Sequence, residues 1–260
     1  MNKIFLVMAM VGLCVVVTYG APQRNQGMDR GAVQRREQDK IKRKVAHDLT
    51  EEGVTGHLAW KEYTANPTAK GEATLLVVLG GRDSFKGTDT PTTMPLAVEK
   101  ALAYAKTQVK DGKTIIWVPE LVAGRRPAPE TPSSDGIAKA VRERAQKHGV
   151  KPERIFVTGY SMGGRLAYTL LQEDQDLFKR AVIVGAAGNA EQAAKIKADI
   201  LACQGSDDDT VSLAKVKAMM SAIEKKRPGG MVLTMLNKTD HKRSEEAAYS
   251  KHDTWKWLFR

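Results

Sequence analysis

Runs of apolar residues recur along the chain from residue 57 onward, and glycine or polar residues separate them. The stretch HLAWKEYTA at 57–65 alternates apolar and polar positions, which is typical of a strand with one exposed face. Apolar runs predict six further strands, of which the first two are expected to be buried. They are ATLLVVLGG at 73–81, TIIWVPEL at 114–121, RIFVTG at 154–159, RAVIVGAAG at 180–188, DILACQG at 199–205 and MVLTMLN at 231–237.

Segments with a helical period lie between these strands. MPLAVEKALAYAKTQV at 94–109 predicts one helix, and GIAKAVRERAQKHG at 136–149 predicts another, with N-caps available at 133–135. AAYSKHDTWKWLF at 247–259 predicts a closing amphipathic helix. One face of a further helix is marked by Val216, Met219, Met220 and Ile223. Because strands alternate with helices, we expect an α/β domain whose mostly parallel sheet carries helices on both faces.

The first 20 residues form a separate pattern. A short basic start, an apolar run from Ile4 to Val17 and a small residue at Gly20 are typical of a secretory signal peptide. The run is short for a membrane span, and a membrane anchor or a core helix is the alternative. The sequence therefore predicts a signal peptide at 1–20, a secreted or periplasmic protein and no stable membrane span.

Residues 21–52 are polar and basic, and RREQDKIKRK at 35–44 has no apolar face. This composition predicts a flexible tail that is solvated or attached to an anionic surface, with the folded domain at 53–260.

The net charge of +11 would suit nucleic acid, but no basic stripe is interleaved with aromatic residues, so we expect no nucleic-acid partner. After cleavage Cys203 is the only cysteine, which excludes an internal disulfide.

The segment IFVTGYSMGGRLAY places Ser161 where a predicted strand meets a predicted helix. Gly159 and Gly163 flank it, as in the G-x-S-x-G nucleophile elbow, where glycines permit a strained turn that exposes the serine hydroxyl. The Met162 amide at the helix start would face the same space and could stabilise an oxyanion. A structural turn is the alternative interpretation.

A serine nucleophile needs a base, and on this architecture the order along the chain is serine, acid, histidine. Only His241 and His252 follow Ser161. His241 comes just after a predicted strand, where its side chain can reach over the sheet, whereas His252 has the spacing of a packing or surface residue. His148, at the end of a predicted helix, fits a structural role. We therefore favour His241 as the base.

Three successive carboxylates at 207–209 follow the predicted strand DILACQG. Because three adjacent carboxylates repel one another, we do not expect this run to be a loop without a specific role. Asp208 is the preferred acid and Asp207 the alternative. A cation site is a second interpretation of the run, but the spacing is not that of an EF-hand, and no metal is predicted.

These segments resemble esterases of the α/β-hydrolase superfamily. VKPERIFVTGYSMGGRLAY is similar to the elbow of the phospholipase/carboxylesterase and polyhydroxybutyrate depolymerase or feruloyl esterase-like groups. QGSDDDTV resembles their G-x-x-D-x-x-V segment, and DHKRSEEAAYSKHDTWKWLF their histidine loop and last helix. The resemblance implies an α/β-hydrolase fold without a large cap, Asp208 as the acid, and ester hydrolysis with no cofactor. It also implies a second oxyanion donor at the Arg82 amide, with Gly81 as the alternative.

Two positions depart from these groups. Gly80 and Gln204 stand where His precedes the glycine in the family pattern. Neither is the predicted base, but a changed oxyanion loop could weaken activity, since one lost donor costs on the order of 10²–10³ in rate. The expected function is a secreted serine esterase, and the minimal size suits a bulky or polymeric ester such as acylated polysaccharide. A non-catalytic binding protein and a secreted serine peptidase are the alternatives. The oligomeric state stays open.

Overall fold

The computed structural model describes residues 48–55, 58–81, 95–120 and 133–260. The predicted signal peptide and all but the end of the predicted tail lie outside these ranges. The strands are β1 (Leu49–Thr55), β2 (Leu58–Ala65), β3 (Gly71–Leu79), β4 (Gly112–Pro119), β5 (Ile155–Tyr160), β6 (Arg180–Val184), β7 (Asp199–Gly205) and β8 (Met231–Leu236). The helices are α2 (Pro95–Gln108), α3 (Ser134–His148), α4 (Met162–Glu173), α5 (Leu213–Glu224), α6 (His241–Tyr249) and α7 (His252–Phe259), with 3-10 turns η2 (Pro152–Arg154) and η3 (Ala190–Lys195).

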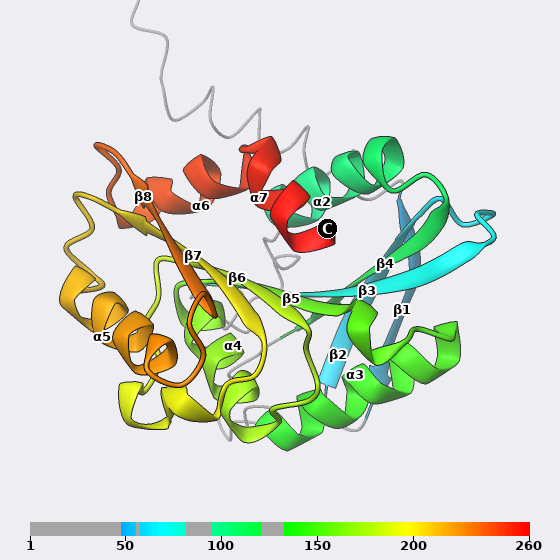
Figure 1. The fold of residues 1–260 in the computed structure, drawn as a ribbon. Helices are drawn as coiled ribbons and strands as arrows, with labels where there is room; N and C mark the ends of the chain where they lie inside the picture. Colours follow the sequence, from blue (N-terminus) through cyan, green and yellow to red (C-terminus); the bar gives the residue numbers. More distant parts are fainter. Residues whose placement is uncertain (1–47, 56–57, 82–94, 121–132) are drawn as a thin grey trace, which may run out of the picture. The chain divides into compact units, whose positions relative to one another are not determined.

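The eight strands form one sheet in the order β1-β2-β4-β3-β5-β6-β7-β8 (Figure 1). β1 and β2 pair antiparallel with each other, and β2 pairs antiparallel with β4. From β4 to β8 every pair is parallel. Five of the apolar runs form the central strands β3 to β7, which are buried on both faces, as expected for a parallel sheet under two layers of helices, whereas the sixth forms the edge strand β8. The predicted α/β class is therefore confirmed.

Two layers of helices cover the two faces of the sheet (Figure 1). α3, α4 and α5 pack on one face, in a core that includes Ile137, Leu171 and Met219. α2, α6 and α7 pack on the other, in a core that includes Leu102 and Leu258. Carboxyl ends of neighbouring parallel strands lie at one edge of such a sheet, and that edge is where sites form.

The structure differs from the expected elements at both ends of the domain. β1 begins at Leu49, so the domain boundary predicted at residue 53 falls inside a strand. The single closing helix predicted at 247–259 is two helices, because α6 ends at Tyr249 and α7 begins at His252. Trp255 Nε1 donates to the Tyr249 carbonyl and Thr254 Oγ1 to the Ala248 carbonyl, so side chains of α7 cap the end of α6.

No helix in the described ranges has both the length and the apolar character needed to cross a membrane. Nor do these ranges contain a cap domain between the strands of the sheet. At its carboxyl end β5 leads directly into α4, and β6 leads into a segment that ends at η3. β7 leads into the acidic run at residues 207–209. The site is therefore built from short connections at that edge.

Candidate active site

Ser161 occupies the corner between β5 and α4 in a strained backbone conformation. Its φ of 53° and ψ of −114° lie in a region that non-glycine residues rarely adopt. The corner is held by a hydrogen bond from the Ser161 N–H to the Val184 carbonyl, 3.0 Å. Ser161 is the N-cap of α4, yet its side chain makes no capping hydrogen bond, so its hydroxyl is available to another partner.

The glycines of the motif are required by close backbone contacts. A Cβ built on Gly159 would lie 2.5 Å from the Gly163 carbonyl oxygen, and one on Gly163 would lie 2.2 Å from the carbonyl oxygen of Leu79. Any larger residue would push α4 away from β3 and β5. The elbow expected from the sequence therefore has the tight packing that its glycines predict.

Ser161, His241 and Asp208 form a continuous chain of hydrogen bonds. Ser161 Oγ lies 2.9 Å from His241 Nε2, and His241 Nδ1 lies 2.9 Å from Asp208 Oδ2. The imidazole side chain is 13% exposed and the Asp208 side chain is fully buried. An ionised Asp208 accepts the Nδ1 proton, which leaves Nε2 with a lone pair toward the serine hydroxyl. This arrangement can accept a proton from Ser161.

Asp208 is distinguished from its two neighbours by its contacts. Its Oδ1 accepts hydrogen bonds from the N–H groups of Thr210 (2.9 Å) and Val211 (2.8 Å). These donors stabilise a buried carboxylate. Asp207, the alternative acid, is exposed and accepts instead from the hydroxyl of Ser206. Among the described residues no group of three or more potential ligands could hold a metal ion.

His241 is the first residue of α6 rather than a loop residue. Asp240 precedes it as the N-cap and accepts from the Arg243 N–H, which lowers the pKa of the Asp240 carboxyl. The aspartate beside His241 thus stabilises the helix start, and its two carboxylate oxygens accept from the N–H and the Nε of Arg243. The α6 terminus fixes where the histidine side chain leaves the backbone.

Tyr160 and Gly185 support the imidazole, and neither was singled out from the sequence. The Tyr160 hydroxyl donates to the His241 carbonyl (2.9 Å), and the two rings lie 5.3 Å apart. Gly185 has a φ of +56°, and a Cβ there would lie 3.3 Å from two imidazole atoms. Tyr160 is a variable position of G-x-S-x-G, so the motif gave no signal for it. The only sequence signal for Gly185 is its position directly after an apolar strand.

Gln204, one of the two departures from the family pattern, lies beneath the acid loop. Its side chain is buried, and Nε2 donates to the Val211 carbonyl, 3.1 Å. Val211 in turn donates its N–H to Asp208. Gln204 therefore stabilises the turn that positions Asp208. At the oxyanion loop, Gly81 packs against the Tyr160 ring. Arg82, the predicted second oxyanion donor, lies outside the described residues, whereas Met162 opens α4 with an N–H that the helix itself leaves unpaired.

Comparisons with known proteins agree with this architecture. Residues 124–252, which include Ser161, Asp208 and His241, match the model of the Dienelactone hydrolase family. The comparison with curated proteins finds no match. A thermostable esterase is similar in structure, with a TM-score of 0.67 and 18% identity over 83% of this chain, and the chain spans 63% of that protein's length.

Two further solved structures are similar over their whole length. A "predicted CIB-like hydrolase" from Thermoplasma acidophilum is 16% identical with a TM-score of 0.57, over 81% of this chain and 97% of that one. Esterase PE8 is 13% identical with a TM-score of 0.57, over 80% and 100%. Identities this low establish the fold, and the family match adds the class of protein. We conclude that the chain has the α/β-hydrolase fold, and that its match to the Dienelactone hydrolase family model over residues 124–252 supports a hydrolase.

Proposed function

We propose that the protein is a serine carboxylic ester hydrolase whose nucleophile is Ser161. The observation that carries the proposal is the hydrogen-bonded series from Ser161 Oγ through His241 to the buried Asp208 carboxylate, with 2.9 Å at each step. An isolated serine hydroxyl is a weak nucleophile near neutral pH, and a base within hydrogen-bonding distance removes that obstacle.

In the proposed reaction His241 Nε2 takes the Ser161 proton while Oγ bonds to the ester carbonyl carbon. The resulting imidazolium then gives this proton to the alkoxy oxygen as the carbon–oxygen bond to the alcohol breaks. Water then enters and loses a proton to the same nitrogen as its oxygen bonds to the acyl carbon. The imidazolium returns this proton to Ser161 Oγ as the bond between Oγ and the acyl carbon breaks, which releases the carboxylic acid and regenerates the enzyme. Asp208 keeps the imidazole in one tautomer and stabilises its cation throughout.

The proposed oxyanion donors are backbone amides. The Met162 N–H at the start of α4 is one, and it adds the positive end of the helix dipole to the developing negative charge. The Arg82 amide is the second, proposed on the family resemblance alone. Such donors act only in the transition state, which makes them effective contributors to rate.

We propose a bulky or polymeric ester as the substrate class and secretion as the destination. The described ranges contain no cap domain to enclose a buried lipid chain, and the Met162 side chain beside Ser161 is 36% exposed. A panel of acetyl, feruloyl and longer acyl esters, free and on polysaccharide, would test the substrate class. Mass spectrometry of the exported protein would test secretion, since a mature chain starting at Ala21 is expected.

The decisive variant is Ser161→Ala, assayed on a short activated ester. We expect kcat to fall by about 10⁶-fold with folding intact, because the nucleophile is lost and only binding and oxyanion stabilisation remain. Ser221→Ala is the matched control, since Ser221 is exposed on α5 and lies away from the turn that holds Asp208. A fluorophosphonate should label the native protein at Ser161. Retained turnover in the variant would refute the proposal, and an unlabelled native protein would favour a non-catalytic binding role on the same scaffold.

A further inference from the structure

The two edges of the sheet differ in their protection against other strands. β1, at one edge, carries Glu51 and Glu52 and has an irregular register near Leu49. Charge and irregularity are the usual features that keep an exposed edge from pairing. β8, at the other edge, reads MVLTML and contains no charged residue. No strand among the described residues pairs with its outer side.

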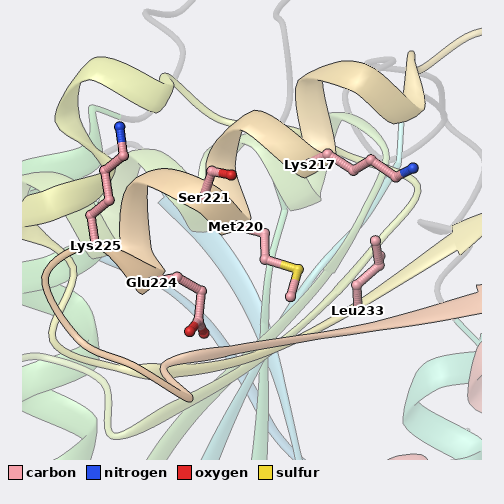
Figure 2. Close-up of a pocket in the computed structure, with 6 residues that line it drawn as sticks. All are labelled: Lys217, Met220, Ser221, Glu224, Lys225 and Leu233. Carbon is pink, nitrogen blue, oxygen red and sulfur yellow. The ribbon is translucent and has the colours of Figure 1, made fainter.

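Apolar side chains are exposed along β8. Val232 is 45% exposed and Met235 is 40% exposed, so each leaves much of its surface in water. Beside the strand runs an open groove of about 620 Å³ between β8 and α5 (Figure 2). Figure 2 shows Met220 from α5 and Leu233 from β8 extending toward each other in this groove. An unpaired edge next to an apolar groove is typical of an interaction surface.

The charges along the groove differ between its two ends, with Lys217 at one end and, at the other, Lys225 beside Glu224, whose carboxylate accepts from the Gly229 N–H. Lys217 lies one turn before Met220 on α5, and Glu224 lies one turn after it. In Figure 2 the Glu224 carboxylate lies on the β8 side of the helix, whereas Lys225 extends away from the strand. A surface with a cation at one end, an anion at the other and apolar residues between them is complementary to itself after a two-fold rotation.

We propose that β8 and α5 form the interface of a homodimer. The β8 strands of two copies pair antiparallel about a two-fold axis through Leu233, which joins the two sheets into one. This register places Leu233 beside the partner's Leu233 and Met235 beside the partner's Met231. It also places the two α5 helices in opposite directions. Lys217 of each copy then faces the partner's Glu224. Parallel pairing would instead place Lys217 beside the partner's Lys217, which like charges disfavour.

The first test substitutes one edge residue and uses the other edge as the control. Val232→Lys places a charge at the centre of the proposed contact, and Val54→Lys places the same charge on β1, where Val54 is 69% exposed. We expect light scattering after gel filtration to give twice the mass of one chain for the native protein and for Val54→Lys, but one chain for Val232→Lys. Circular dichroism checks that both variants fold. A native protein that is monomeric at every concentration, or a dimer that survives Val232→Lys, would overturn the proposal.

The second test examines the charge pairing itself. Lys217→Glu should raise the dimer dissociation constant by on the order of 100-fold, because a carboxylate at position 217 then faces the partner's Glu224 in both symmetry-related contacts. The double variant Lys217→Glu, Glu224→Lys restores both opposite-charge pairs and should recover most of the dimer. Lys215→Glu, on the same exposed helix but outside the groove, is the control for net charge. Equal weakening by Lys215→Glu, or no recovery in the double variant, would contradict this interface. Ester hydrolysis is measured separately and does not enter either outcome.

Discussion

Three consecutive aspartates, residues 207–209, have different surroundings although their side chains are identical. The Asp208 side chain is fully buried and accepts hydrogen bonds from the Thr210 and Val211 N–H groups as well as bonding His241. Asp207 is exposed, and its carboxylate accepts a hydrogen bond from the hydroxyl of its neighbour Ser206. A buried carboxylate stays ionised only where several donors face it. Only the Asp208 side chain meets that condition beside the imidazole.

The pair Asp208→Asn and Asp207→Asn tests this difference. Asp208→Asn should lower kcat by roughly 10⁴-fold, because an amide can donate to Nδ1 and so favours the tautomer that cannot accept the serine proton. Asp207→Asn removes the same charge one residue away and should change kcat little. Steady-state rates on a short activated ester provide the measurement. Similar losses in both variants would show that net charge near the site, and not the contact to His241, controls the rate.

Individual site residues could be predicted where chain order and motif restrict the choice. Ser161 stands in the elbow, His241 is one of two later histidines, and Asp208 lies in an acidic run after a strand. The support from Gln204 and Tyr160 could not be predicted. It depends on how the loops after β7 and β5 fold back over the sheet, which no local pattern specifies.

At the scale of elements, α6 links the histidine to the core. It starts at His241 and ends at Tyr249, whose side chain is fully buried between α7 and the sheet. Thr158 Oγ1 donates to the Val182 carbonyl, so its hydroxyl proton is occupied and Tyr249 donates to the Thr158 oxygen at 2.9 Å. This bond joins the end of α6 to β5, the strand that carries Ser161. The position of His241 relative to Ser161 therefore depends on how α6 docks.

Tyr249→Phe should lower the free energy of unfolding by about 1 kcal/mol, because it removes a buried hydrogen bond while keeping the ring. The loss should appear in urea unfolding as a lower midpoint with an unchanged slope. Tyr104→Phe is the control, since Tyr104 lies in the same apolar layer but is only partly buried. A change of stability as large for Tyr104→Phe as for Tyr249→Phe would mean that the hydrogen bond to Thr158 contributes nothing measurable.

The break between α6 and α7 was missed for an identifiable reason. The segment 247–259 keeps an apolar face across Ser250 and Lys251, so periodicity alone predicts one helix. The chain instead ends α6 there because Thr254 and Trp255 supply donors to its last carbonyls. Side-chain capping of this kind depends on the tertiary path and carries no periodic signal.

At the scale of the whole molecule, the centre of the sheet and its edge strand β8 were predictable from the sequence, whereas the edge strand β1 was not. Strands that are buried on both faces must be continuously apolar, and β3 to β7 have that pattern. β1 reads LTEEGVT, with charged residues in its middle, and its strand conformation depends on pairing with β2. An edge strand needs no continuous apolar run, because only one of its two hydrogen-bonding edges pairs with another strand and the other faces solvent.

Burial across the whole core also makes the stability of this protein sensitive to alkaline pH. Burial raises the pKa of the Cys203 thiol to about 12, from an ordinary value of 9.0, because β7 places it between the sheet and α6. Burial likewise raises the pKa values of Tyr168 and Tyr249 from 10.0. These groups keep their protons in the folded protein while the unfolded chain loses them. Stability is therefore complete below pH 9 and falls as the pH rises above it.

Comparison of the native protein with Cys203→Ala between pH 9 and pH 10 isolates the thiol, because the unfolded tyrosines contribute equally to both proteins. Native protein should lose free energy of unfolding more steeply than the variant, by a difference in slope that approaches one proton per molecule. Cys203→Ala should be less stable at neutral pH, because it leaves a small cavity, yet should lose less stability across this interval, since only its buried tyrosines then release protons on unfolding. Urea unfolding at closely spaced pH values measures both slopes. Parallel curves for the two proteins would mean that Cys203 ionises in the folded state as readily as in the unfolded one, which its burial in the core opposes.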